Sequence, residues 1–220
     1  MSLKKELVEI CHKVYAKGFV AAFDGNLSLR TPDNTFLITR SAICKGDVTE
    51  DDIIEIDCYG NVINGSAKIS TENKIHLFIY NNRNDINAVI HAHPVYTTAI
   101  ASSKNILDRP VFPEVVLTIG RVPLCKYATP STDELTESMR PFVGFASVFL
   151  LQNHGAVVAG KNINHAYYLM EKLEHTAKVL INSEILGGAN LISFEKLEEL
   201  YSIAESTYGL EIKNENKFLD

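Results

Sequence analysis

Apolar residues recur at spacings of three and four over the first part of the chain, which predicts an amphipathic helix over residues 3–19. The residues on its apolar face are Leu3, Leu7, Ile10, Cys11, Val14 and Tyr15. Similar spacings predict further helices over residues 70–82, 97–102, 162–186 and 193–206. Ser70 or Thr71 can cap the first of these, because short hydroxyl side chains accept hydrogen bonds from exposed backbone N–H groups.

Short runs rich in β-branched and apolar residues predict strands between these helices. The predicted strands cover residues 35–39, 53–57, 87–93, 115–118, 148–152 and 156–159. Helices and strands alternate without the regular βαβ rhythm of a nucleotide-binding sheet. We therefore expect a three-layer α/β/α fold with a mixed, mainly antiparallel sheet, formed by one domain over residues 1–220.

Composition narrows the functional classes. The 220 residues include 21 Lys and Arg against 27 Asp and Glu, a net charge of −6, which disfavours a dedicated nucleic-acid binder. The longest apolar runs are far shorter than the roughly 20 residues of a membrane-spanning helix, and the N-terminus lacks the apolar region of a signal peptide. Four cysteines without CxxC spacing favour reduced thiols in a cytoplasmic protein.

Three histidines carry the strongest chemical signal. His91 and His93 end a predicted strand, and residues i and i+2 of a strand point to the same face. His154 follows another apolar run and precedes a glycine. Three imidazoles with an open fourth position form the catalytic type of zinc site. An HxH pair alone is weak support, since histidines in strands are often packing residues, but His154 strengthens the prediction.

Glu72 opens the helix predicted after Ser70. A glutamate at this position is commonly favoured by the helix dipole alone. Beside a metal, however, it would serve as a general base, with burial shifting its pKa towards the working pH. His76 lies on the same helical face and is either a support for the site or a packing residue. For His12, His165 and His175 we expect structural roles.

Small polar residues form three clusters suited to an anion: Gly25-Asn26 with Ser28, Thr39-Arg40-Ser41, and Ser70-Thr71. Backbone N–H groups and short hydroxyl or amide side chains bind phosphate well. Each cluster alone is also typical of an ordinary turn. Without a GxGxxG or GxxxxGK[ST] motif, a small phosphorylated metabolite fits better than a nucleotide.

Together these segments resemble the class II aldolase/adducin family. The shared strings, in order, are GNLS, ITRSAICKGD, STENKIH, NAVIHAHP, KYATPST and QNHG, and the family member they resemble most is L-fuculose-1-phosphate aldolase. The resemblance covers nearly the whole chain. It implies a three-layer α/β/α subunit with one bound zinc ion, in a homotetramer whose active sites lie at subunit interfaces.

The resemblance also implies roles for individual residues. His91, His93 and His154 match the zinc ligands, and Glu72 matches the acid/base of the aldolase, where the epimerase of the family has aspartate. The matching phosphate-binding positions are Asn26, Ser41, Ser70 and Thr71, with the Ala42 N–H as a further donor. Tyr208, in a TYGL tail, matches a proton donor that reaches a neighbouring active site; a loose tail contact is its alternative.

Two positions depart from the aldolase pattern, Glu114 and Pro130, where the aldehyde end of the substrate would lie. We expect a zinc-dependent aldolase that reversibly cleaves a phosphorylated ketose to dihydroxyacetone phosphate and a small aldehyde. The alternatives are a sugar-phosphate 4-epimerase or dehydratase on the same scaffold, and a non-catalytic adducin-like interaction domain. A Schiff-base aldolase using Lys45 is disfavoured, because no activating surroundings are evident for this lysine.

Overall fold

The computed structural model describes residues 2–66 and 68–219, with Tyr208 described in its backbone only. One mixed sheet runs through this part of the chain in the order β4-β3-β2-β1-β5-β8-β7-β6. Neighbouring strands are antiparallel except β6 and β7, which are parallel. The strands are β1 (Asn26–Arg30), β2 (Phe36–Thr39), β3 (Ile53–Ile56), β4 (Val62–Asn64), β5 (Ala88–Ala92), β6 (Leu124–Cys125), β7 (Val148–Leu151) and β8 (Gly155–Gly160).

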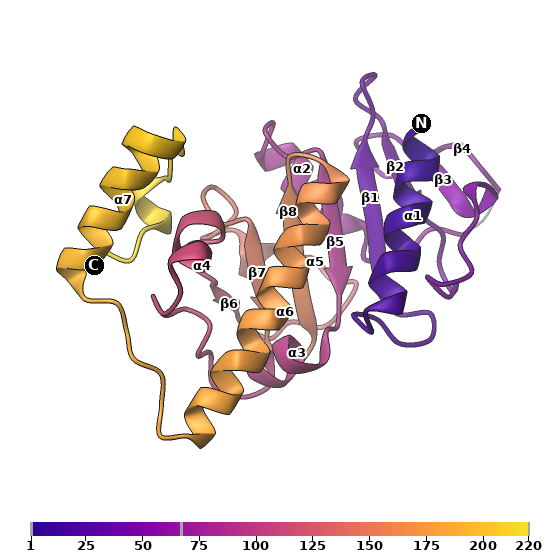
Figure 1. The fold of residues 1–220 in the computed structure, drawn as a ribbon. Helices are drawn as coiled ribbons and strands as arrows, with labels where there is room; N and C mark the ends of the chain where they lie inside the picture. Colours follow the sequence, from indigo (N-terminus) through magenta and orange to yellow (C-terminus); the bar gives the residue numbers. More distant parts are fainter. Residues whose placement is uncertain (1, 67, 220) are drawn as a thin grey trace.

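Helices cover both faces of this sheet, as Figure 1 shows. One face packs against α1 (Leu3–Ala16), α3 (Val95–Ala101) and α6 (Ile163–Ile185), and the other against α2 (Asn73–Asn82) and α5 (Asp133–Met139). The alternation along β5 accounts for the two cores: Ile90 faces the first set of helices and Val89 the second. The expected three-layer α/β/α fold with a mainly antiparallel sheet is therefore confirmed.

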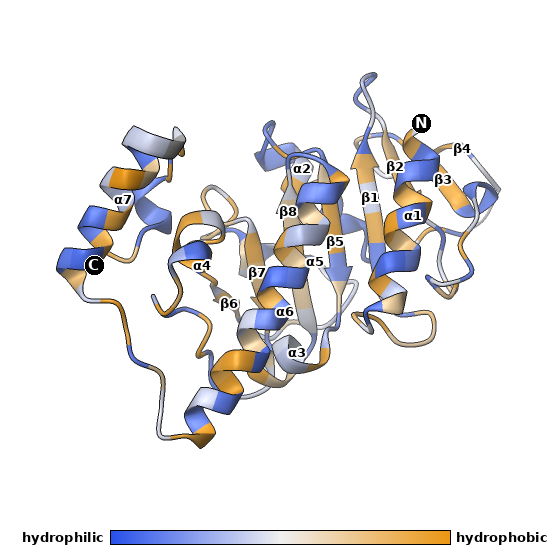
Figure 2. Ribbon diagram, in the orientation of Figure 1, coloured by the Kyte–Doolittle hydropathy of each residue, from blue (hydrophilic) through white to orange (hydrophobic). Residues whose placement is uncertain are grey.

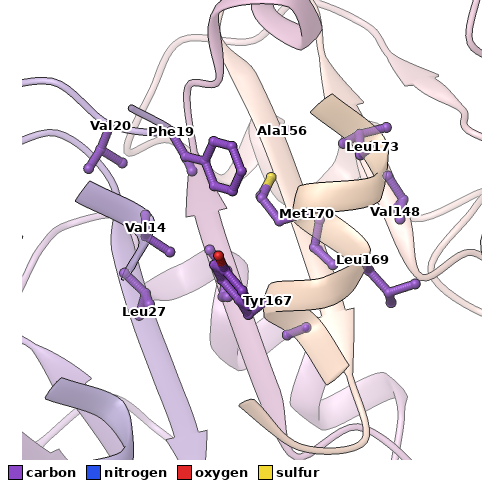
Figure 3. Close-up of a cluster of buried hydrophobic side chains, with 14 of the residues drawn as sticks. Val14, Phe19, Val20, Leu27, Val148, Ala156, Tyr167, Leu169, Met170 and Leu173 are labelled. Atoms are coloured by element: carbon purple, nitrogen blue, oxygen red, sulfur yellow. The ribbon is translucent and has the colours of Figure 1, made fainter. Parts of the chain in front are cut away.

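The larger core lies between the sheet and the long helix α6. Figure 3 shows Tyr167, Met170 and Leu173 of α6 directed towards Phe19 and Val148. These side chains are almost fully buried, and each contributes roughly 1.5–3 kcal/mol when it leaves water. Figure 2 shows charged and polar residues along the outer side of the same helix. The amphipathic pattern predicted for residues 162–186 thus places the apolar side of this helix on the sheet and its polar side outwards.

The strand predicted over residues 115–118 is wrong. This segment belongs to α4 (Pro113–Thr118), with proline in the first turn and Val115 and Val116 buried. The β-branched valines suggested a strand, but Pro113 supplies a φ suited to the start of a helix and has no N–H to lose. The strand β6 was not predicted, because its two residues are too few to show a period. The seven-residue helix α5 was also not predicted, although α3 of equal length was.

The C-terminal helix α7 (Phe194–Tyr208) packs on α4 at the edge of the molecule (Figure 1). Leu197 and Tyr201 bury against Val116, and the Asn216 side chain binds the carbonyl of Ile119 at 3.1 Å. Two short 3-10 turns, η1 (Glu50–Asp52) and η2 (Asn214–Asn216), complete the elements. Among the described helices none has the length and apolar character needed to span a bilayer. The single domain over residues 1–220 stays a prediction.

Candidate metal centre and active site

The residues of the site come from three neighbouring strands in the middle of the sheet. Asn26 begins β1 and pairs with His91 near the end of β5. His93 follows β5, where Pro94 ends the strand and begins the approach to α3. His154 lies in the turn between β7 and β8, beside β5. Because these strands are antiparallel neighbours, residues far apart in the sequence meet where the ends of the strands lie side by side.

The three predicted metal ligands lie together. One nitrogen from each of His91, His93 and His154 can be chosen so that all lie within 4.8 Å of one another. The Nε2 atoms of His91 and His93 are 3.2 Å apart. His91 Nδ1 lies 3.0 Å from the carbonyl oxygen of Ala156; a carbonyl only accepts, so Nδ1 carries the proton and Nε2 has a lone pair. The residues therefore fit a divalent metal ion.

Burial keeps two of these imidazoles neutral, as metal binding requires. It lowers the pKa of His91 to about 3, with Glu72 acting in the opposite direction. The pKa of His93 is also lowered, mainly by burial and then by His154, although Asp24 opposes the shift. The Oδ2 atom of Asp24 lies 3.8 Å from His93 Nδ1. That side of the His93 ring thus faces a carboxylate while Nε2 faces the other histidines.

Two glycines allow this close approach of backbone and rings. A Cβ on Gly155 would lie 2.4 Å from His93 Cδ2 and 2.7 Å from the carbonyl oxygen of Ala92. A Cβ on Gly25 would lie 2.7 Å from the carbonyl oxygen of His91, and Gly25 also has φ +73. Both positions lack the space for a Cβ, and Gly25 also needs the backbone freedom of glycine.

Glu72 lies beside the triad. Its Oε1 is 3.3 Å from His154 Nε2 and its Oε2 is 3.5 Å from His91 Nε2. The residue precedes the first turn of α2 and makes no capping hydrogen bond with its side chain. The carboxylate therefore contacts the histidines and does not cap the helix. The sequence alone left both interpretations open.

The charge state of Glu72 differs from the one we expected. Burial raises the pKa of its carboxyl group, as predicted, but the hydrogen bond to His154, the neighbouring His91 ring and the hydrogen bond from Asn26 outweigh burial and lower the pKa to about 2. Glu72 is thus a carboxylate at neutral pH. A proton reaches it only from an acidic C–H or O–H group held close to it.

His76 is buried and belongs to a chain of hydrogen bonds that ends at Glu72. Its Nε2 lies 2.5 Å from Asn26 Oδ1, and its Nδ1 lies 2.6 Å from Ser28 Oγ. Asn26 Nδ2 donates to Glu72 Oε2 at 3.1 Å. Ser28 Oγ lies 2.7 Å from the hydroxyl of Tyr80. Ser28 was expected in an anion-binding cluster, but it is buried and contacts His76 and Tyr80 instead. Nothing in the sequence pattern distinguished Tyr80 from an ordinary core residue.

A cavity of about 350 Å³ opens onto His93, His154 and Glu72. Of the expected phosphate-binding residues, Asn26, Ser41, Ala42 and Ser70 line it. Thr71 does not: its hydroxyl lies 2.5 Å from Ser131 Oγ, at a neighbouring cavity.

Arg40, from the Thr39-Arg40-Ser41 cluster, also lines this cavity and is held by Asp52, with Nε 2.6 Å from Oδ1. Sequence reasoning did not single out Phe23 and Asp24, which line the cavity too. Asp24 directly precedes the Gly25-Asn26 turn, and its place next to this motif is the signal that would have found it.

Lys45 lies beneath the cavity wall and is buried. Its ammonium group donates to the carbonyl oxygens of Ile43 at 2.9 Å and Phe23 at 3.2 Å. Burial lowers its pKa, yet its contacts are backbone carbonyls on the two loops that line the cavity. The arrangement favours a structural role and gives no support to a Schiff base.

The remaining expected residues lie outside this cavity or outside the described atoms. The side chain of Tyr208 is not among the described residues, so its role stays a prediction. Glu114 lies in the first turn of α4. His12 Nε2 contacts the carbonyl oxygen of Val48 at 2.9 Å, in keeping with a structural role. The four cysteines all lie in the described part and form no disulfide.

Comparison with known proteins shows the family to which this chain belongs. The model of the Class II Aldolase and Adducin N-terminal domain matches residues 5–181. The chain belongs to the class II aldolase/adducin family. Its histidine triad is consistent with the divalent metal site typical of class II aldolases. The family implies a phosphorylated sugar substrate and a lyase activity, either aldolase or decarboxylase.

Relatives within the class II aldolase/adducin family carry both activities in their names. A 3-oxo-tetronate 4-phosphate decarboxylase of Pectobacterium atrosepticum is 34% identical over 193 residues, 86% of each chain. An L-fuculose phosphate aldolase of Methanocaldococcus jannaschii is 34% identical over 178 residues, 81% of this chain and 95% of the relative. The crystal structure of YgbL from Escherichia coli has a TM-score of 0.84 and 30% identity, covering 90% of this chain and 97% of that one.

Proposed function

We propose that this protein is a zinc-dependent aldolase that reversibly cleaves a phosphorylated ketose, of the L-fuculose 1-phosphate type, to dihydroxyacetone phosphate and a small aldehyde. The observation that carries the proposal is the Glu72 carboxylate, 3.3 Å from His154 Nε2 at the cavity with the phosphate-binding residues. His91, His93 and His154 would hold the ion. Zinc there would act as a Lewis acid towards the carbonyl and adjacent hydroxyl oxygens of the ketose.

The residues of the chain supply binding and proton transfer. Asn26, Ser41, Ser70 and the Ala42 N–H hold the phosphate in the same cavity, so that binding energy orients the reacting bond. The bond between C3 and C4 breaks, and its electron pair stays on C3 as an enediolate. The Glu72 carboxylate removes a proton from C3 in the condensation direction, and in cleavage it passes to C3 a proton that it has first taken from a substrate hydroxyl group.

Release of the aldehyde requires a second proton transfer, because the C4 hydroxyl loses its proton as the new carbonyl forms. Tyr208 serves this oxygen in a neighbouring subunit of a homotetramer. If subunit interfaces complete the sites, activity should fall when the assembly dissociates. Activity that stays constant on dilution to monomers, followed by light scattering, would contradict this part of the proposal.

Decarboxylation of 3-oxo-tetronate 4-phosphate is the second function that the observations favour, because relatives with that name are as similar as the aldolases. Loss of CO2 from this acid leaves the same enediolate of dihydroxyacetone phosphate. The triad, Glu72 and the phosphate site would serve both reactions equally. The difference is that CO2 leaves without giving up a proton, so a donor such as Tyr208 has no task in the decarboxylase.

The deciding experiment measures dihydroxyacetone phosphate release by zinc-loaded and chelator-treated protein. The substrates are a panel of ketose 1-phosphates, including L-fuculose 1-phosphate, and 3-oxo-tetronate 4-phosphate. Zinc-dependent release from a ketose supports the aldolase, and release only from the acid supports the decarboxylase. No release with metal bound points to an epimerase or dehydratase. Glu72→Gln should keep the metal and lose turnover by orders of magnitude.

A further inference from the structure

The hydrogen bonds behind Glu72 have a direction that the chemistry of their end groups sets. The carboxylate of Glu72 only accepts, so the atom of Asn26 that faces it at 3.1 Å must be the amide nitrogen. The oxygen of the same amide therefore faces His76, 2.5 Å from Nε2. This contact requires a proton on Nε2 of the imidazole.

The other side of the imidazole completes the assignment. His76 is 1% exposed, and burial lowers its pKa to about 3 although Glu72 opposes the shift. It is thus neutral, with one proton, and Nδ1 accepts from Ser28 at 2.6 Å. Ser28 has then used its own proton, so the Tyr80 hydroxyl donates to Ser28 at 2.7 Å. Each imidazole and hydroxyl donor in the chain is thus used once, and Asn26 Nδ2, which has two protons, also donates to Ser70 Oγ at 3.4 Å.

We propose that His76 is a positioning residue, which holds the Asn26 amide with its N–H group towards Glu72 and thereby holds the Glu72 carboxylate at the metal site. Without the imidazole N–H, nothing on the buried side binds the oxygen of the Asn26 amide. The amide can then turn away from its present position, and the Glu72 carboxylate loses the N–H donor that holds it. Asn26 thus orients Glu72 in addition to lining the phosphate cavity.

The paired variants His76→Leu and His76→Gln test this assignment. Leucine fills much of the space but donates nothing, whereas glutamine restores an N–H donor towards Asn26. We expect His76→Leu to lower kcat by about 10- to 100-fold, the usual effect of removing a partner that orients a site residue, with KM and metal content within about twofold of wild type. His76→Gln should recover most of the lost kcat.

His12→Leu is the matched control. It also removes an imidazole that contacts the chain, at the carbonyl oxygen of Val48, but outside the cavity, and should leave kcat unchanged. A folded His76→Leu variant with wild-type kcat would overturn the proposal. So would a His76→Gln variant as impaired as His76→Leu.

A spectroscopic measurement keeps this test separate from the proposed function, on which the role of Glu72 in turnover rests. Nitrogen NMR of the zinc-loaded protein should show His76 protonated on Nε2 and unprotonated on Nδ1 at neutral pH. The side-chain amide protons of Asn26 should shift in His76→Leu and return in His76→Gln. A proton on Nδ1 would overturn the inference even in an active enzyme. If wild-type protein cleaves no sugar phosphate, the proposed function fails, and these spectra still decide the role of His76.

Discussion

Replacing Gly155 with alanine should weaken metal binding through a single methyl group. The added Cβ would lie 2.4 Å from His93 Cδ2 and 2.7 Å from the Ala92 carbonyl oxygen, where ordinary carbon contacts are about 3.5–4.0 Å. The backbone of β5 is held by its pairs on both sides, so the contact with the Ala92 carbonyl strains the sheet, and the imidazole moves by roughly 1 Å on the difference in carbon contacts. Metal–nitrogen distances tolerate deviations of only about 0.2 Å.

The expected loss is therefore about 10- to 100-fold in metal affinity, the range seen when the orientation of a metal ligand is disturbed. Crowding should also destabilise the metal-free protein by about 1–3 kcal/mol. Affinity is measured by competition with a chromophoric chelator, and stability by urea unfolding. Gly144→Ala is the control, because a Cβ there meets nothing within 4 Å. Wild-type zinc affinity in folded Gly155→Ala would refute the assignment of His93 as a ligand held by this contact.

Three further predictions follow from the described contacts. Burial holds the pKa of His76 and of His91 at about 3, below the unfolded value near 6.5. Between these two pH values the unfolded chain binds more protons than the folded one. The free energy of unfolding of metal-free protein should therefore fall as pH falls from about 6.5 to 3. Urea midpoints across this range check the direction, and a stability that is flat or rises on acidification contradicts it. When the free metal concentration is 1,000 times Kd, removing the metal should lower the free energy of unfolding by roughly 4 kcal/mol. That corresponds to roughly 8–16 °C in Tm for a chain of this size, as scanning calorimetry with and without chelator would show. An unchanged Tm would mean that the ion does not bind the folded site. Lys45→Met leaves the carbonyls of Ile43 and Phe23 without their buried donor and should cost about 1–3 kcal/mol, with KM raised more than kcat since both loops shape the cavity; a rise in stability would disprove the role given to the ammonium.

The metal site could be predicted from the sequence because its signal is local. The period of a strand puts His91 and His93 on one face, and an NHG turn after an apolar run marks His154. The fold class followed from the alternation of elements and from the family motifs. The residues Asn26, Ser41, Ser70 and Glu72 also meet at one cavity, as their separate clusters suggested.

The residues that contact the site residues from behind, and the effects of those contacts, could not be predicted in the same way. Ser28 and Tyr80 are ordinary residues in a strand and a helix, and their role depends on the packing of α2 against β1. The low pKa of Glu72 arises from histidines on β5 and the β7–β8 turn, whose distances no spacing reveals. Thr71 differs from expectation because Ser131, 60 residues later in the chain, offers it a partner. Long-range contacts decide each of these features.

The arrangement of β1, β5 and β8 as neighbours also has a kinetic consequence. His93 and His154 are 61 residues apart in the chain, and only the pairing of β5 with β8 brings them together. Contacts between such distant residues form slowly, because the intervening chain must first lose its freedom. A nascent or refolding chain thus presents scattered histidines with little affinity for an ion, and tight metal capture follows completion of the central sheet. Loading with metal is therefore a late event in the folding of this protein.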